Sequence, residues 1–344
     1  GCTVRRVVFT GGGTEAANLA IKGAVAMMQN GRNQVITSSV EHPAVANTCG
    51  WLRDRGYTIT VLPVDETGRV RPEDLKAAVS DRTALVSIMA ANNETGTVQP
   101  IRELADIAHE NGALMHTDAV QAFGKVKVGV CDLGADLLTI SAHKIYGPKG
   151  IGALVIQQGT HTNFKLVPLV HGGHQERNLR AGTENTIGII AYAAACNALK
   201  NTLTDETARV TSIRDRFESL VKESIPEIII NGENAPRKGD TSNISFRYIE
   251  GESILLRLDM EGIRVSTGSA CSTGSLDPSH VIMALHDDAE SAHGSIRFSF
   301  GRENTMEEAE KTVSVLKETV SFLRSISPLA QGKEFGPDRC TCKE

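Results

Sequence analysis

The first two hundred residues alternate short apolar runs, rich in β-branched residues, with longer stretches of helical periodicity. This alternation is typical of a parallel sheet whose strands are connected by helices. We expect helices over residues 15–28 and 102–111, the second ending at Gly112. The expected strands cover residues 6–10, 34–38, 58–63, 84–89, 114–117, 137–141 and 152–156. The sequence therefore predicts an α/β fold, in which ligands bind at the carboxyl ends of the strands.

The pattern changes after about residue 200. A long polar helix over 205–223 precedes a strand over 227–231, the strand-like run NISFRY and a helix from Glu252. Thr305 and Glu308 have the spacing of a capping box, ahead of a terminal helix whose apolar stripe is Val313, Leu316, Val320 and Leu323. We expect a large domain over 1–202, a smaller α+β domain over 203–330 and a flexible tail over 331–344.

Composition excludes several classes of protein. Hydrophobic residues make up 40% of the chain, which indicates a packed protein. The 36 basic and 41 acidic residues give a net charge of −5, so the sequence lacks the excess of positive charge typical of proteins that bind nucleic acids or membrane surfaces. No apolar run reaches the ~20 residues that span a bilayer, and the start shows no signal pattern. Seven cysteines, an odd number spread along the chain, argue against a disulfide framework. We therefore expect a cytoplasmic protein.

Polar side chains follow five of the expected strands. The glycine-rich turn at residues 11–14 opens a helix, where exposed N–H groups favour a phosphate, although such a turn is structural about as often. Its spacing matches neither GxGxxG nor the P-loop, which argues against NAD or ATP. The other four strand ends carry, in chain order, His42, Asn93, Asp118 with Gln121, and Lys144 between Ser141, His143 and a glycine turn.

Taken singly, most of these residues have a simpler interpretation. His42 alone would be a packed or solvated histidine, and Asp118 a helix cap. Lys144, at the buried end of a strand, is not an ordinary surface lysine. Together the set offers what pyridoxal phosphate (PLP) requires: a lysine for its aldehyde, a carboxylate for its ring nitrogen, and N–H and hydroxyl donors for its phosphate. The residues therefore predict a PLP site.

Longer motifs carry a family resemblance: FTGGGTEAANLAI, EHPAV, NNETG, HTDAVQ, SAHKIYGPKGIGAL, GGHQERNLRAGTEN, STGSACSTGSLDPSHV and IRFSFGR. From its first residue to about Ser327, the sequence resembles a NifS/IscS-like cysteine desulfurase, a fold-type-I PLP enzyme of aminotransferase class V. The resemblance implies a mostly parallel seven-stranded sheet, a smaller C-terminal domain and a homodimer. It also implies a transferase that converts L-cysteine to L-alanine and passes the sulfur to an iron–sulfur scaffold protein or another acceptor.

The resemblance further implies roles for individual residues. Lys144 would be the Schiff-base lysine, Asp118 the partner of the ring nitrogen, and His42 both the ring stacked on the cofactor and a proton carrier. Arg297 would bind the substrate carboxylate through its guanidinium fork, with Asn93 beside the substrate. Asn93 and Gln121 would flank the phenolic oxygen, and the phosphate would be held by Gly13, Thr14, Ser141, His143 and Thr183 of the partner subunit.

Cys271 is the expected nucleophile, from its surroundings as well as from the family. It lies in STGSACSTGS, a run of small residues that can neither pack a core nor hold a stiff conformation. Such a loop lets a thiolate enter the site, take sulfur and leave as a persulfide. Cys271 could touch an iron–sulfur cluster during transfer, and no other metal site is expected. Cys340 and Cys342 lack the further ligands of a closed zinc site, so we expect an uninvolved tail.

Other interpretations stay open at this point. An aminotransferase or a selenocysteine lyase would share the cofactor, although an aminotransferase needs no thiol at Cys271. The family begins several dozen residues earlier, so an inactive scaffold for a cluster-assembly partner is a further alternative. Nucleotide binding at residues 11–15 would leave Lys144 and Asp118 unexplained. A yellow protein bleached by borohydride would favour the enzyme over the scaffold.

Overall fold

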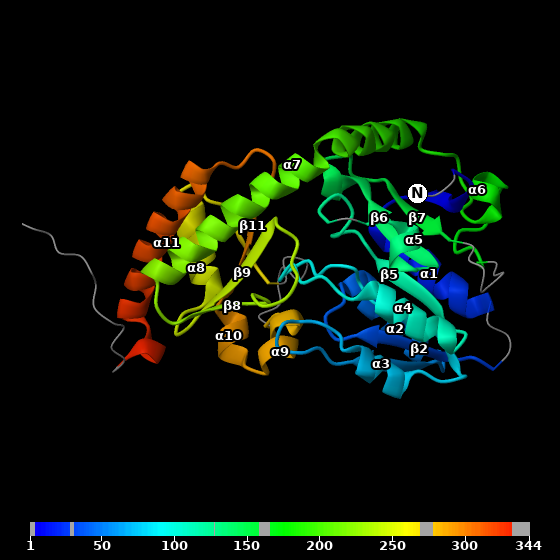
Figure 1. The fold of residues 1–344 in the computed structure, drawn as a ribbon, viewed down its shortest axis with the longest axis horizontal. Helices are drawn as coiled ribbons and strands as arrows, with labels where there is room; N and C mark the ends of the chain where they lie inside the picture. The colour runs from blue at the N-terminus through cyan, green and yellow to red at the C-terminus, as the bar shows by residue number, and fades with distance from the viewer. Residues whose placement is uncertain (1–3, 28–30, 127, 158–165, 269–277, 332–344) are drawn as a thin grey trace, which may run out of the picture. The chain divides into compact units, whose positions relative to one another are not determined.

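The computed structural model describes residues 4–27, 31–126, 128–157, 166–268 and 278–331 (Figure 1). The chain divides into two compact units. The first comprises Gly1–Thr207 with Asn234–Lys238, and the second comprises Ala208–Glu233 with Gly239–Glu344. A short piece of the first unit is thus inserted, in sequence, between two segments of the second.

A seven-stranded sheet forms the centre of the first unit, in the order β1-β7-β6-β5-β4-β2-β3 (Figure 1). β6, β5, β4, β2 and β3 are parallel to one another, whereas β7 pairs antiparallel with both β6 and β1. β1 consequently runs in the same direction as the parallel strands. In chain order the strands are Val7–Thr10, Gln34–Ser38, Thr58–Leu62, Thr83–Ser87, Leu114–Asp118, Leu137–Ser141 and Gly152–Ile156. The predicted mostly parallel α/β sheet is confirmed.

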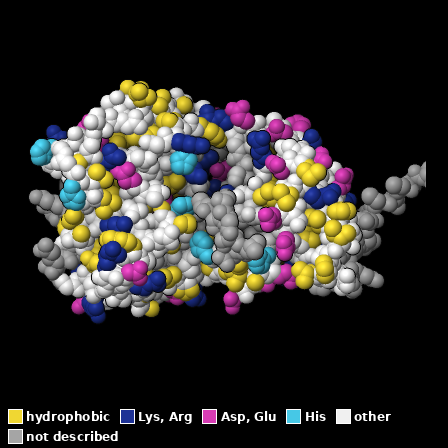
Figure 2. Space-filling view, turned by 180° about the vertical axis from the view of Figure 1, so that it is seen from behind, with side chains coloured by type: hydrophobic (Ala, Val, Ile, Leu, Met, Phe, Trp, Pro, Cys, Tyr) yellow, Lys and Arg dark blue, Asp and Glu magenta, His cyan; other side chains and the backbone are white. Residues whose placement is uncertain are grey.

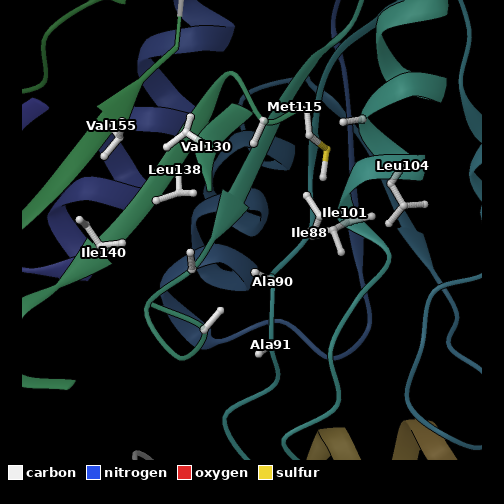
Figure 3. Packing of buried hydrophobic residues seen from close by; sticks show 14 of the residues in the cluster. Ile88, Ala90, Ala91, Ile101, Leu104, Met115, Val130, Leu138, Ile140 and Val155 are labelled. Carbon is white, nitrogen blue, oxygen red and sulfur yellow. The ribbon is translucent and has the colours of Figure 1, made fainter. Parts of the chain in front are cut away.

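Helices cover both faces of this sheet. On one face, α1 (Gly13–Met27) and α2 (Pro43–Arg53) bury Leu19 and Val45 in a cluster with the strands. On the other, α4 (Ile101–Glu110) packs against β4 and β5, and Figure 3 shows Leu104 and Met115 in this cluster, together with Leu138 of β6. Each fully buried side chain of this size contributes about 1.5–3 kcal/mol. The shorter helices are α3 (Pro72–Ala78), α5 (Val130–Leu133) and α6 (Gln175–Asn178).

The helix expected over residues 205–223 begins much earlier than predicted, since α7 spans Thr186–Ser224. Its first half packs a stripe at helical spacing against the core of the first unit: Ile189, Tyr192, Cys196, Leu199 and Leu203. The alanine-rich sequence around this stripe and the exposed Ile187 and Ile190, at 82% and 70%, obscure it in the sequence. The prediction of its N-terminus was therefore wrong.

The second unit is built on a four-stranded antiparallel sheet in the order β10-β11-β9-β8. In chain order these strands are Ile228–Ile230, Thr241–Phe246, Ser266–Thr267 and Ser295–Ser299. Phe217, Phe246 and Leu316 belong to the apolar cluster on one face, with α8 (Gly251–Met260) and α11 (Met306–Ile326). The predicted capping box of α11 is confirmed, because Thr305 and Glu308 exchange hydrogen bonds, each 3.2 Å long. Helices α9 (His280–His286) and α10 (Ala289–His293) precede β11.

Residues 234–238 attach to the turn that follows β4. The amide of Val98 donates to the carbonyl of Pro236 at 2.8 Å, and the amide of Lys238 donates to the carbonyl of Gly96 at 2.9 Å. Backbone bonds with a segment far along the chain therefore hold the NNETG turn.

The surface shows charges of both signs. On the face drawn in Figure 2, positive and negative side chains of the described residues are interspersed and form no broad basic area there. Among the described helices, none combines the length and apolarity that crossing a membrane requires.

Candidate active site

Strand β7 brings two strand ends to the same level. Thr10 at the end of β1 and Ser141 at the end of β6 both pair with Gly152 of β7. A Cβ atom at residue 152 would lie 2.6 Å from the carbonyl carbon of Gly12, so only glycine fits where β7 passes the glycine-rich turn. The turn after β1 and the segment after β6 therefore lie side by side.

An open cavity of about 750 Å³ lies at this junction. A Cβ atom at Gly13 would come within 2.8 Å of Val120, so the turn packs directly on the loop after β5. The first turn of α1 lines the cavity, and the N–H groups of a helix N-terminus favour an anion. The cavity is lined by Gly11, Gly12, Gly13, Thr14, Glu15, Asn18, His143, Lys149, Gly150 and Leu169.

Ser141 and His143 form a polar pair after β6. The Ser141 hydroxyl lies 2.9 Å from His143 Nδ1. Burial lowers the pKa of His143, and the charges of Lys144 and Lys149 lower it further. A neutral His143 and a hydroxyl are thus held next to the α1 N-terminus, where one of the two can donate to an anion while it is hydrogen-bonded to the other.

Glu15 and Arg180 were not singled out in the sequence, yet they fix the glycine-rich turn. The amide of Gly11 donates to Glu15 Oε2 at 2.7 Å, and Arg180 Nε donates to Glu15 Oε1 at 2.8 Å. An acidic residue in the first helical turn after a glycine run is the sequence signal that could have identified Glu15. Arg180 carries no comparable local signal, since it lies 165 residues away.

Asp118 and Lys144 extend from neighbouring strands. Asp118 ends β5, is buried, and accepts a hydrogen bond from the amide of Val120 at 2.9 Å. Burial raises the pKa of Asp118 to about 6, whereas the nearby charge of Lys144 lowers it. Lys144 is half-buried in a 3-10 turn, Ala142–Ile145, that continues β6. A carboxylate that is mostly ionised at pH 7 therefore lies within electrostatic range of a lysine.

His42 begins α2 with a defined orientation. It is the N-cap residue, and its Nδ1 accepts a hydrogen bond from the amide of Ala44 at 3.1 Å. Because Nδ1 is occupied as an acceptor, Nε2 is the ring atom that exchanges a proton.

Glu41, next to His42, ties two strand ends together. Its Oε1 accepts from the Ser38 hydroxyl at 2.6 Å and from the Met89 amide at 2.9 Å, which connects the segments after β2 and β4. Burial, together with the charge of Asp118, raises the pKa of Glu41 to about 8. Glu41 therefore stays protonated at pH 7. Sequence analysis did not single it out.

The structure separates the two asparagines of the NNETG turn. Asn92 is buried, with its Oδ1 accepting from the amides of Glu94 at 2.7 Å and Thr95 at 3.0 Å and its Nδ2 donating to the carbonyl of Val40 at 3.0 Å. Asn93 is half-buried. Asn92 thus builds the turn, and Asn93 is the one that a ligand can reach.

The remaining expected residues lie elsewhere or are not described. Gln121 is half-buried in the turn after β5, and Thr183 is exposed just before α7. Arg297 is half-buried on β11 of the second unit. Cys271 lies outside the described residues. The first unit therefore brings together the glycine-rich turn, Asp118, and residues 141–144.

The comparisons with known proteins agree with this geometry. The model of the aminotransferase class-V family matches residues 2–312. The chain belongs to this family. "Cysteine desulfurase IscS" of Dictyoglomus turgidum is 50% identical over 325 residues, covering 94% of this chain and 82% of the relative. The protein of the same name from Methanosarcina thermophila is 47% identical over 336 residues, covering 97% and 81%.

Comparison with solved structures also places this class-V chain beside NifS-like proteins. A structure described as a "NIFS-LIKE PROTEIN" superimposes with a TM-score of 0.84 at 33% identity, covering 93% of this chain and 84% of that one. The NifS-like protein from Rickettsia africae gives 0.82 at 29% identity, covering 93% and 84%. Within its family, the chain thus groups with the cysteine desulfurases.

Enzymes of this class-V group depend on PLP, and the residues present fit that cofactor. A phosphate fits at the N-terminus of α1, in a turn that packs too closely for side chains at Gly13 and Gly152. Asp118 offers a buried carboxylate for a cationic ring nitrogen, and Lys144 an amine for an aldehyde.

Proposed function

We propose that this chain is a PLP-dependent cysteine desulfurase that converts L-cysteine to L-alanine and keeps the sulfur as a persulfide on Cys271. The observation that carries the proposal is the ionised Asp118 beside Lys144, at adjacent strand ends next to the α1 cavity. Support for the substrate comes from the structure described as "SspA in complex with cysteine", which has a TM-score of 0.76 at 34% identity and covers 88% of this chain and 84% of that one.

The residues of the first unit bind the cofactor and move protons. When bound, PLP supplies an electron sink for negative charge at the substrate Cα. Lys144 Nζ would bind the aldehyde and would move the proton at the substrate Cα. The Asp118 carboxylate would keep the ring nitrogen cationic. Gly13, Thr14, Ser141 and His143 would hold the phosphate, and Asn93 and Gln121 would flank the phenolic oxygen.

Sulfur transfer is the task of Cys271 and His42. Cys271 Sγ, as a thiolate, attacks the substrate sulfur: an S–S bond forms, the Cβ–S bond breaks, and the carbon fragment takes the electron pair. Protonation of that fragment releases L-alanine. His42 Nε2 is the proton-exchanging atom for this step, because Nδ1 is bonded to the Ala44 amide.

Arg297 and a second subunit complete the proposed site. Arg297 binds the substrate carboxylate through two parallel N–H donors, with Asn93 beside the substrate. The enzyme is a homodimer in which Thr183 of the partner subunit adds a hydroxyl to the phosphate site. An iron–sulfur scaffold protein or another acceptor then takes the sulfur in the cytoplasm.

The test is turnover of L-cysteine by the PLP-loaded protein, with sulfide and alanine both quantified. We expect equal amounts of the two under reducing conditions. Cys271→Ser should keep the yellow colour, release no sulfide and carry no persulfide, because a serine hydroxyl is almost never ionised at neutral pH. Mass spectrometry of the parent after cysteine treatment should find extra sulfur on the peptide containing Cys271. Extra sulfur only on Cys340 or Cys342 would overturn the assignment.

A further inference from the structure

A row of polar side chains crosses one face of the second unit's sheet. On β9, Ile244 lies in the apolar cluster, so its neighbour Asn243 is on the opposite face. Arg297 on β11 pairs directly with Asn243, and the amide of Asn231 donates to the carbonyl of Asn243 at 2.8 Å. Arg297, Asn243 and Asn231 therefore lie in one line across β11, β9 and the end of β8.

Short hydrogen bonds connect this row to α9. Nε2 of His286, the last residue of α9, lies 2.7 Å from Asn231 Oδ1. Asn231 Nδ2 lies 2.6 Å from Asn243 Oδ1 and 2.9 Å from the Ser245 hydroxyl. Asn231, Asn243 and Ser245 are all 0% exposed. The polar groups of the row are thus sealed from solvent, apart from half-buried His286 and Arg297 at its two ends.

One donor of the row, Asn243 Nδ2, lacks an acceptor among the described residues. With Oδ1 of Asn243 directed at Asn231 on the β8 side, its Nδ2 is on the side of β11, where Arg297 is the register partner of Asn243. Asn243 Nδ2 is buried and makes no hydrogen bond within the part of the chain that the structure describes. A guanidinium carries donors only, so the side chain of the register partner on β11 offers this buried donor no acceptor. Leaving such a donor unpaired in the interior is costly.

Turning both amides by 180° removes this conflict. The oxygen and nitrogen of an amide occupy nearly equivalent places, and an imidazole nitrogen is a donor or an acceptor, so the heavy-atom distances are kept. His286 Nε2 then accepts from Asn231, and Asn231 Oδ1 accepts from Asn243 and Ser245. Burial lowers the pKa of His286, which favours the neutral ring that accepting requires. Asn243 now directs its oxygen at Arg297.

We propose that His286, Asn231 and Asn243 form a buried hydrogen-bonded row that holds the Arg297 guanidinium through the amide oxygen of Asn243. Asn243 is a positioning residue, because its complete burial means that it acts on the substrate only through Arg297. The inference rests on the proposed role of Arg297 as the carboxylate-binding residue. The inference adds Asn243 as the residue that orients the Arg297 side chain.

The test compares Asn243→Leu with Ser242→Ala. Leucine keeps the branching of asparagine at Cγ but is larger and has no acceptor, so we expect KM for L-cysteine to rise about tenfold while kcat changes less than about twofold. Ser242 is the adjacent residue on β9, equally buried but on the other face, and Ser242→Ala should leave both constants unchanged. In an Arg297→Ala background, Asn243→Leu should raise KM no further, because residues that act through one another are not additive.

The outcomes distinguish the role of Arg297 from the role of the row that holds it. Arg297→Ala with an unchanged KM would refute the proposed role of Arg297 itself. A raised KM in Arg297→Ala together with an unchanged KM in Asn243→Leu, or with effects that multiply in the double variant, would refute the row alone. If Asn243→Leu does not fold, His286→Leu at the half-buried end of the row replaces it. We expect that variant to raise KM about threefold, and an unchanged KM there would equally overturn the proposal.

Discussion

The two sheets of this protein place their polar side chains in different ways. In the first unit, helices cover both faces of the sheet, and the polar residues follow the carboxyl ends of its strands, as Asp118 and Lys144 do. In the second unit, one face of the sheet is apolar and the other carries Asn231, Asn243 and Arg297 across three strands. The first arrangement is built by short loops, and the second by strand register.

The difference determines what a change of one residue should do. Strand ends in the first unit hold the groups that bond a cofactor and exchange protons, so their loss should appear in kcat and in cofactor colour. The row on the second sheet holds one side chain in place, so its loss should appear in KM. The following predictions test this division, beginning with the largest effect.

Lys144→Ala should abolish turnover and the yellow colour of the holoenzyme. Lys149 is the lysine among the described residues that line the α1 cavity, and it follows Pro148 in a glycine turn. Absorbance spectra of both variants after incubation with PLP give the comparison: Lys149→Ala should stay yellow. Normal colour in Lys144→Ala would contradict the assignment of the lysine.

Glu41→Gln should abolish a pH dependence of stability. The pKa of Glu41 is raised from 4.5 to about 8, so between these values the unfolded chain has lost a proton that the native protein keeps. Stability therefore falls as pH rises through this window, by about 5 kcal/mol at most. Glutamine mimics the protonated acid, and the variant should exceed the parent in stability at pH 8 but not at pH 4.5. Urea unfolding at both pH values is the measurement, and parallel pH profiles would refute it.

Asp118→Asn should retain the cofactor but lower kcat by at least ~10²-fold. A neutral side chain no longer keeps the ring nitrogen cationic, and about 2.7 kcal/mol at the barrier accounts for that factor. Steady-state kinetics with saturating PLP measures it. Unchanged turnover would place the carboxylate away from the ring.

Thr305→Ala should cost only about 1 kcal/mol of stability, the usual loss for an N-cap. It removes the capping hydrogen bond of α11 in the second unit without touching the polar face of the sheet. Its KM for L-cysteine should equal that of the parent, measured beside thermal unfolding. A raised KM would mean that any weakening of the second unit mimics the loss of Asn243.

The same contrast explains how far sequence analysis reached. Strands such as Gln34–Ser38 were predicted because continuous burial leaves an apolar run between turn residues. Their ends were found because a polar residue directly after such a run is visible locally. Asn231 and Asn243 escaped, since only the register of β8, β9 and β11 aligns them with Arg297. Arg297 itself was found through the family motif IRFSFGR, not from its own surroundings.

The attachment of residues 234–238 to the turn after β4 bears on where this chain can be divided. A fragment that stops at Thr207 keeps all seven strands of the large sheet but loses Pro236 and Lys238, whose backbone atoms bond the turn that carries Asn93. The larger unit is therefore not a contiguous gene segment. Exchanging the smaller unit between homologues would require three junctions in the DNA, and recombination at a single point would leave the NNETG turn bonded to a foreign segment.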